Sequence, residues 1–333
     1  MSWFEALVGF AEENPQQVRA NLQIVDRAFL KSKVTGGVFR CGHLDIPSLD
    51  ELRERTSKLQ KKPGKRLSVT EIVGDVQKLH QAAENDGALF QVASQFNLLE
   101  MVGPHVTPER GVGIYEHDRT QGPACAIACG AATIFRNYFA EVDGHQIGQS
   151  ADKQLDCLGD LGVALGNHDG GLWRMSNGYA LASAAGLQKV CETLSAADDA
   201  ALDALRGKLR IGVHSEAAVT LGHSSNIVTQ ALCSALPVAY CDHQSELWEP
   251  FARLVLDAAY EATLHLGVAQ KEKTGCSLVF LTLLGGGAFG NSTVWITSAI
   301  ARALRQFSNS GLDVRIVSYG RSSTEVQALV SRF

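Results

Sequence analysis

Several kinds of feature are missing from this chain. No apolar run reaches the roughly 18 residues that a membrane-spanning helix needs, and residues 1–36 lack the basic-then-apolar pattern of a secretory signal. The eight cysteines form no Cys-x-x-Cys pair, and the ten histidines form no His-Glu-x-x-His motif. The formal net charge of -5 gives no basic excess for nucleic acid. We therefore expect a soluble, cytoplasmic protein with reduced thiols, no metal or cofactor, and no nucleic-acid or membrane partner.

What is present is the composition of a globular protein, with 45% hydrophobic and 20% charged residues in a chain of 333. We predict an N-terminal helical extension over residues 1–66 and a catalytic domain over 67–333, with a helical insertion at about 140–200. The two parts meet at a basic run around a Pro-Gly break, formed by Lys61, Lys62, Lys65 and Arg66. Such a run is typical of a solvated connection, with partner binding as the alternative.

From residue 68 onward, helix-like and strand-like patterns alternate. Helical spacing predicts helices over residues 68–80, 120–139 and 245–266, and after residue 291. Strands are predicted over residues 88–96, 209–214, 227–237, 277–284 and 313–319. Strands that are separated by helices imply a largely parallel or mixed sheet that is covered on both faces. The predicted fold class is therefore α/β, a three-layer α/β/α sandwich with a mixed central sheet.

A glycine-rich loop follows the strand predicted over residues 277–284. It consists of Gly285, Gly286, Gly287, Ala288, Phe289 and Gly290, with Asn291 next in the chain. Glycines let the backbone approach a ligand, and a turn before a helix aims N–H groups at an anion, so a diphosphate is the expected ligand. The alternatives are a tight turn without a ligand, and Asn291 as a simple helix cap.

Two common nucleotide motifs do not fit this loop. A Rossmann fingerprint normally opens its domain and is followed by a strand that ends in an acidic residue. Here fewer than fifty residues follow the loop, and the next strand ends in Val317-Ser318-Tyr319-Gly320 without a carboxylate. A P-loop is excluded because no Gly-Lys-Ser/Thr follows the glycines.

The order of elements from about residue 68 to the C-terminus resembles a macrodomain, the ADP-ribose-binding α/β/α fold. The stretch Ala93–Asn97 stands where that family has a motif close to Asn-Ala-Ala-Asn. The resemblance implies that Asn97 holds the distal ribose, whereas Ser94 replaces the first asparagine of the motif. It also implies that the glycine loop wraps the diphosphate and that Phe289 packs on the ribose, with a core aromatic as the alternative.

Two further residues are candidates for binding. Gln121 is a possible orienting group for the ligand, although a structural role is the alternative. Asp75 resembles the aspartate with which the family binds adenine, with a position on a helix surface as the alternative.

Aspartates suggest where a reaction would occur. Asp152, Asp156 and Asp160 recur every fourth residue, so a helix would place them on one face, where a planar guanidinium can bind carboxylates. A solvated helix face is the alternative. Asp118 lies just before the helix predicted over residues 120–139, and Asp169 lies in a predicted loop. Both are therefore further candidates to approach the same pocket. Cleavage of ADP-ribose from arginine would pass through an oxocarbenium-like state, which carboxylates stabilise.

The aspartate series, the stretch DRTQGPACAIACGAA and the glycine loop together resemble the arginine-specific, MavL-like branch of ADP-ribosyl hydrolase macrodomains. This resemblance implies a hydrolase that removes ADP-ribose from modified arginine side chains and binds ADP-ribose and a mono-ADP-ribosylated protein. It assigns catalysis to Asp152 and Asp160, with Asp118 and Asp169 as further candidates. Two alternatives stay open: a non-catalytic ADP-ribose reader, and a hydrolase of acid-linked ADP-ribose or of a free ADP-ribose metabolite.

Overall fold

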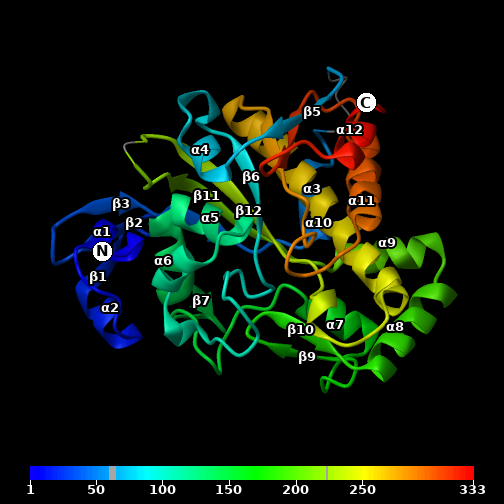
Figure 1. Ribbon diagram of the computed structural model, residues 1–333, viewed down its shortest axis with the longest axis horizontal. Coiled ribbons are helices and arrows are strands. Elements are labelled where there is room, and N and C mark those ends of the chain that lie inside the picture. The colour runs from blue at the N-terminus through cyan, green and yellow to red at the C-terminus, as the bar shows by residue number, and fades with distance from the viewer. Residues whose placement is uncertain (60–64, 223) are drawn as a thin grey trace.

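The computed structural model describes residues 1–59, 65–222 and 224–333 (Figure 1). At its centre lies a seven-stranded sheet in the order β4-β11-β12-β6-β13-β14-β5. Five strands run parallel: β5 (Ser68–Val73), β6 (Leu89–Ala93), β12 (Ile227–Cys233), β13 (Leu278–Leu281) and β14 (Asp313–Ser318). The other two pair antiparallel at one edge: β11 (Gly212–Ala218) and β4 (His43–Asp45). The sheet is therefore mixed, as predicted.

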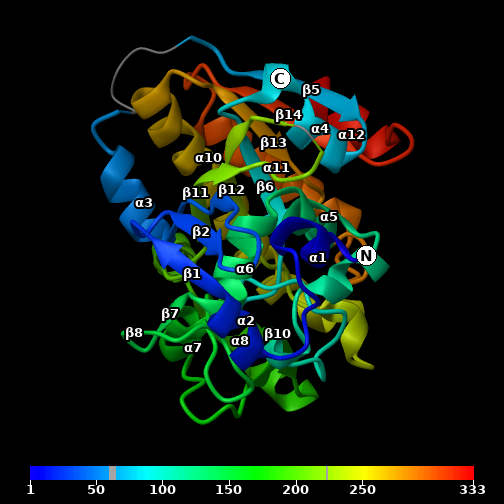
Figure 2. The ribbon, with the colours of Figure 1, turned by 90° about the vertical axis from the view of Figure 1, so that its left-hand side faces the viewer.

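Helices cover both faces of this sheet (Figures 1 and 2). One layer contains α3 (Leu49–Thr56), α10 (Ser245–Thr274) and α11 (Thr293–Gln306), and the other contains α4 (Val76–Gln81), α5 (Gln121–Ala128) and α6 (Gly130–Tyr138). Neighbouring residues of β6 show the two sides. The Phe90 ring stacks on His80 of α4 with 3.8 Å between centroids, whereas Gln91 donates to Thr263 Oγ1 of α10 at 2.9 Å. Because successive side chains of a strand point to opposite faces, the three-layer α/β/α class is confirmed.

Residues 1–66 contain strands as well as the predicted helices. Helices α1 (Trp3–Val8) and α2 (Pro15–Asn21) precede a small antiparallel sheet of β1 (Leu22–Val25), β2 (Phe29–Ser32) and β3 (Val38–Arg40). The segment then contributes β4 to the central sheet, and α3 packs on α10. These strands were missed because three or four residues are too few to display a two-residue period. Lys61 and Lys62 of the basic run lie outside the described residues, so its binding role stays a prediction.

The segment at about 140–200 combines helices with two hairpins. The first hairpin is β7 (Glu141–Val142) with β8 (His145–Gln146), and the second is β9 (Trp173–Ser176) with β10 (Tyr179–Ala182). Helices α7 (Gly159–Leu165), α8 (Ala184–Ala196) and α9 (Asp199–Gly207) complete it. The description of this segment as a helical insertion was therefore incomplete, because it did not include the hairpins.

Two predicted helices differ from the structure. Residues 68–80 form β5 followed by α4, and the Asp75 carboxylate begins α4 by accepting a hydrogen bond from the Gln77 N–H at 2.8 Å. The apolar spacing fitted a helix, but every residue of β5 pairs with β14, and sheet pairing overrides local preference. The helix expected over 120–139 divides into α5 and α6 at Cys129, whose ψ of 56° is not helical. Short helices and a last helix complete the chain: η1 (Ala83–Asn85), η2 (Pro108–Arg110), η3 (Gly113–His117), η4 (Val238–Tyr240) and α12 (Thr324–Val330).

The start of α5 packs directly on the end of β6, and this contact yields a stability prediction. A Cβ added at Gly122 would lie 1.9 Å from the Ala93 carbonyl oxygen, which is far inside contact distance. We expect Gly122→Ala to lower the free energy of unfolding by about 3 kcal/mol, measured by urea denaturation. Gly159→Ala is the matched control, because its nearest neighbouring atom would be 3.5 Å away. Equal effects of the two substitutions would contradict this packing.

Candidate active site

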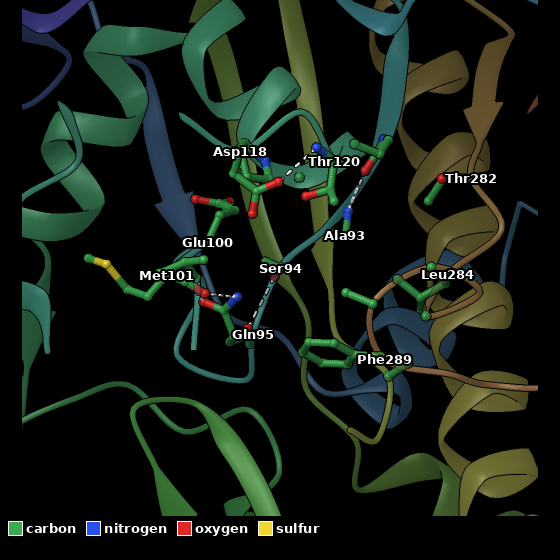
Figure 3. A pocket seen from close by; sticks show the side chains of 18 of the residues that line it. Ala93, Ser94, Gln95, Glu100, Met101, Asp118, Thr120, Thr282, Leu284 and Phe289 are labelled. Atoms are coloured by element: carbon green, nitrogen blue, oxygen red, sulfur yellow. Dashed lines mark hydrogen bonds between the residues drawn. The ribbon is translucent and has the colours of Figure 1, made fainter. Parts of the chain in front are cut away.

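A pocket opens where three parallel strands end, β6, β12 and β13 (Figure 3). Its walls include residues that directly follow each strand: Ser94 and Gln95 after β6, Ala235 after β12, and Thr282 after β13. Carboxyl ends of parallel strands are the usual place for ligands in open α/β sheets, because the chain diverges there into loops. We call this hollow, of about 150 Å³, the inner pocket.

Glu100 forms part of the inner-pocket wall and is almost fully buried, with 2% of its surface exposed. Its Oε1 atom lies 3.4 Å from Nη2 of the fully buried Arg136, whereas Oε2 has no hydrogen-bond partner in the described part of the chain. Burial raises the pKa of the Glu100 carboxyl to about 7, although the positive charge of Arg136 opposes that rise. A carboxyl of this kind exchanges its proton near neutral pH, as a general acid or base must.

Asp118 lies beside Glu100 in the same wall, and Phe289 lies across the pocket from Asp118 in Figure 3. The Asp118 carboxylate accepts a hydrogen bond from the Thr120 N–H at 2.8 Å, which fixes its direction just before α5. Asp118 also lines two neighbouring hollows. It therefore stands at the junction of three spaces.

Tyr115 sets the positions of both carboxylates. Its buried hydroxyl accepts a hydrogen bond from the Glu100 N–H at 3.0 Å, and its carbonyl oxygen accepts one from the Asp118 N–H at 3.1 Å. The turn before Tyr115 is held by Glu12, whose carboxylate accepts hydrogen bonds from the N–H groups of Val112 and Gly113 at 3.0 and 2.6 Å. The N-terminal segment, which packs against α6 and η3, thus supports the pocket (Figure 2).

The glycine loop forms the opposite wall, directly before α11. Gly285, with a φ of 74°, turns the chain away from β13, and four residues of the loop line the inner pocket: Gly285, Gly287, Ala288 and Phe289. At Gly287 an added Cβ would meet nothing within 4 Å, so this glycine borders open space. The Phe289 ring packs against Tyr179 and Tyr240, with centroid distances of 5.2 and 5.6 Å, which makes one side of the pocket aromatic.

A wider cleft of about 1080 Å³ continues from the inner pocket along the ends of β13, β14 and β5. The two share wall residues: Asp118, Thr120, Gln121, Thr282, Leu283 and Gly287. Arg119 and Arg321 line the cleft, and neither forms an ion pair with another described residue. Tyr319, 78% exposed, and Asp75 lie in the same walls. The cleft thus offers two available guanidinium groups and an aromatic surface.

The predicted aspartate face is not formed. Only Asp160 lies within a helix, because α7 begins at Gly159, and its carboxylate pairs with Arg210 Nε at 2.8 Å. Asp152 is exposed in the preceding bend, and Asp156 accepts a hydrogen bond from the Leu158 N–H. Asp169 closes its own turn by accepting from the Gly171 N–H. None of the four lines the inner pocket or the cleft, so among the predicted catalytic residues only Asp118 does.

The predicted binding residues divide into pocket walls and supports. Gln121 lines the pocket, but its amide already bonds the backbone of β6, accepting from Ala93 N–H and donating to Gln91 C=O. Asn97 is fully buried and lines neither space; its side chain donates to Gln154 and accepts from the Leu99 N–H.

The end of the glycine loop is also partly structural. Gly286 lines the cleft, whereas Gly290 and Asn291 line neither the inner pocket nor the cleft. Asn291 is buried and donates to the Leu236 carbonyl at 2.8 Å. It is not the helix cap, because the Ser292 hydroxyl accepts from the Val294 N–H at the start of α11.

Glu100 was missed by sequence reasoning. The available signal was a single carboxyl between apolar residues, directly after Leu98 and Leu99 and before Met101, in the loop that follows a strand. Acidic residues are seldom fully buried without a function or a partner.

Among the described residues, no group of three or more His, Cys, Asp or Glu side chains is arranged to hold a metal ion. No helix in the same part of the chain is both long and apolar enough to cross a membrane.

No protein-family model and no curated protein sequence matches this chain. Among solved structures, poly(ADP-ribose) glycohydrolase from Thermomonospora curvata has a similar backbone, with 13% sequence identity and a TM-score of 0.44. The alignment covers 96% of this chain and 97% of that chain. Poly(ADP-ribose) glycohydrolase from Deinococcus radiodurans in complex with ADP-ribose is also similar, with 9% sequence identity and a TM-score of 0.47. That alignment covers 87% of this chain and 92% of that chain. A likeness at this level concerns the fold and decides no chemistry.

The resemblance to the arginine-specific branch was wrong. The similar structures are described as poly(ADP-ribose) glycohydrolases, and the aspartates on which that resemblance depended do not meet in this structure. The predicted aspartate face required one continuous helix over residues 152–160, whereas α7 starts only at Gly159.

The raised pKa of Glu100 predicts how stability depends on pH. The native carboxyl keeps its proton up to about pH 7, whereas in the unfolded chain it loses the proton near its ordinary pKa of 4.5. The native state therefore binds more protons between these values, and the free energy of unfolding falls as pH rises from about 4.5 to 7. We expect Glu100→Gln to remove this part of the pH dependence in urea denaturation. Glu141→Gln, an exposed change on β7, is the control, and parallel curves for all three proteins would contradict the assignment.

Proposed function

We propose that this protein is a hydrolase that cleaves the glycosidic bond at the distal ribose of ADP-ribose groups. One observation carries the proposal: Glu100 and Asp118 line the inner pocket together with the glycine loop, and this pocket continues into a cleft with two available arginines. Structures of similar fold are described as poly(ADP-ribose) glycohydrolases, one of them in complex with ADP-ribose. That likeness adds only the fold; the support for the activity is the pocket.

The ligand has one arrangement that uses all of these features. The diphosphate lies at the glycine loop and the start of α11, where backbone N–H groups favour an anion. The nucleoside half extends into the wider cleft, whose volume suits a nucleotide and where Arg119 and Arg321 balance negative charge and Tyr319 offers a face for stacking. The distal ribose occupies the inner pocket against Phe289, with its anomeric carbon toward the two carboxyl groups.

The reaction then follows from the two carboxyl groups. The bond from the anomeric carbon to the leaving-group atom breaks, and the carbon passes through an oxocarbenium-like state. The oxygen of water bonds to the anomeric carbon, and one proton is transferred to the leaving group. Glu100, with a pKa near 7, carries that proton, while the Asp118 carboxylate stabilises the positive charge and orients the water.

An oxygen-linked leaving group fits this pocket better than a guanidinium. The buried Glu100 carboxyl already has a cationic neighbour in Arg136, and Asp118 is the other carboxylate of the inner-pocket wall. A guanidinium needs paired carboxylates at its own position. We therefore propose an acetal or ester linkage through oxygen.

The proposal is tested by release of free ADP-ribose from substrates joined through serine, glutamate and arginine. We expect release from the oxygen-linked substrates. Glu100→Gln should lower kcat by about 100-fold or more, with the Kd for ADP-ribose little changed. Asp160→Asn, which lies outside the pocket, is the matched carboxylate control. Binding of ADP-ribose without any release would identify a reader instead, and release from arginine alone would contradict the proposed linkage.

The glycine loop gives an independent test of the binding mode. A side chain at Gly287 would extend into open space that both the inner pocket and the cleft share. We expect Gly287→Val to raise the Kd for ADP-ribose at least about 10-fold, measured by calorimetry, because a branched side chain displaces the ligand. The melting temperature should stay close to that of the wild type, since no protein atom is displaced. Unchanged affinity would place the ligand elsewhere.

A further inference from the structure

A third hollow of about 440 Å³ adjoins the inner pocket. We call it the outer hollow. Its walls come from the loop after β6 and from η2 and η3, and include Val102, His105, Arg110, Ile114, His117 and Asp118. It shares Val102 and Asp118 with the inner pocket, so the two spaces meet at the proposed site of bond cleavage.

The position of Asp118 assigns a role to this hollow. Among the residues that the structure describes, Asp118 alone lines the inner pocket, the cleft and the outer hollow. With the distal ribose in the inner pocket and the nucleotide in the cleft, the leaving group departs past Asp118. The outer hollow adjoins that path.

The lining of the outer hollow combines the Arg110 guanidinium with apolar side chains. The guanidinium of Arg110 forms no ion pair with any residue the structure describes, and the exposed His105 and His117 lie in the same wall. Asp118, at the boundary, is the lining carboxylate. The neighbouring Glu109 does not line the hollow, because its carboxylate accepts a hydrogen bond from the Ala151 N–H at 2.8 Å.

Apolar side chains complete this surface. Val102 is 61% exposed, and Ile114, which is half-buried, lines the same hollow. The wall is also firmly held. Asn137 donates to the Pro108 carbonyl at 3.1 Å, and Glu12 fixes the turn before η3. The hollow is therefore preformed, which lowers the entropy cost of binding.

From this lining we propose that the outer hollow is the subsite for the leaving group, and that it takes a polypeptide with acidic and apolar residues next to the modified side chain. This inference rests on the proposed function. Acidic side chains pair with Arg110, and apolar ones cover Val102. An ADP-ribose chain offers the negative charge but no aliphatic side chains for Val102 and Ile114, so the peptide fits both features better.

The test compares two serine-modified peptides, one flanked by Glu and Leu and one by Lys and Ser. For the wild type, kcat/KM should favour the acidic peptide by about fivefold or more, the size that an exposed ion pair supports. Arg110→Glu should abolish or invert this ratio. Arg174→Glu, the same charge change at an exposed position of β9 outside the outer hollow, should keep it. Equal ratios in all three proteins would overturn the proposal.

Two further measurements separate this inference from the activity. A modified serine without flanking residues reports on hydrolysis alone, so its failure sinks the proposed function. In that case the fluorescence anisotropy of the labelled modified peptides tests the subsite by binding alone. Tighter binding of the acidic peptide by the wild type than by Arg110→Glu supports the proposed subsite, and equal binding by the two proteins overturns it. A loss in Arg110→Glu that appears only with an ADP-ribose chain, and not with the acidic peptide, would identify a phosphate-bearing occupant and overturn the peptide assignment.

Discussion

The burial of Glu100 against Arg136 is the constraint on which the candidate site depends. Neither side chain reaches water, and Arg136 also donates to the Leu98 carbonyl at 3.0 Å and to Thr133 Oγ1 at 3.0 Å. Removing two ionisable groups from water is costly, and their attraction offsets this cost only when further hydrogen bonds hold the pair. Arg136 therefore ties the loop after β6 to α6. The Glu100 side chain, which forms part of the pocket wall, is held by the core of the protein and not by a mobile loop.

Segments far away in sequence share this support. Glu12, in the N-terminal part, holds the turn before Tyr115, while Tyr179 on β10 donates to the Met101 carbonyl at 2.7 Å. Asn177, at the tip of the same hairpin, donates to the Pro104 carbonyl at 2.8 Å. The loop that carries Glu100 is thus fixed from both sides. Parts of the chain that sequence reasoning treated as an extension and an insertion help to build the site.

What could be predicted from sequence follows from the range of the interactions. The strand that ends at Ala93 and the glycine loop were predicted because their signals lie within a few consecutive residues. The aspartate face failed because its spacing assumed a helix that begins only at Gly159. Glu100 was missed because its raised pKa comes from burial in the folded chain, beside Arg136, a residue 36 positions away that opposes the rise. No local pattern encodes that environment.

The same contact bears on the choice between an enzyme and a reader. A protein that only binds ADP-ribose needs the glycine loop and the cleft, and gains nothing from a buried carboxyl oxygen without a partner. Glu100 Oε2 is such an atom in the described chain, and an unsatisfied buried polar group lowers stability. Glutamine at this position would keep the volume and could donate a hydrogen bond, but it could not exchange a proton near pH 7. The proposed proton transfer gives the buried carboxyl at the pocket wall a role, whereas binding alone gives it none.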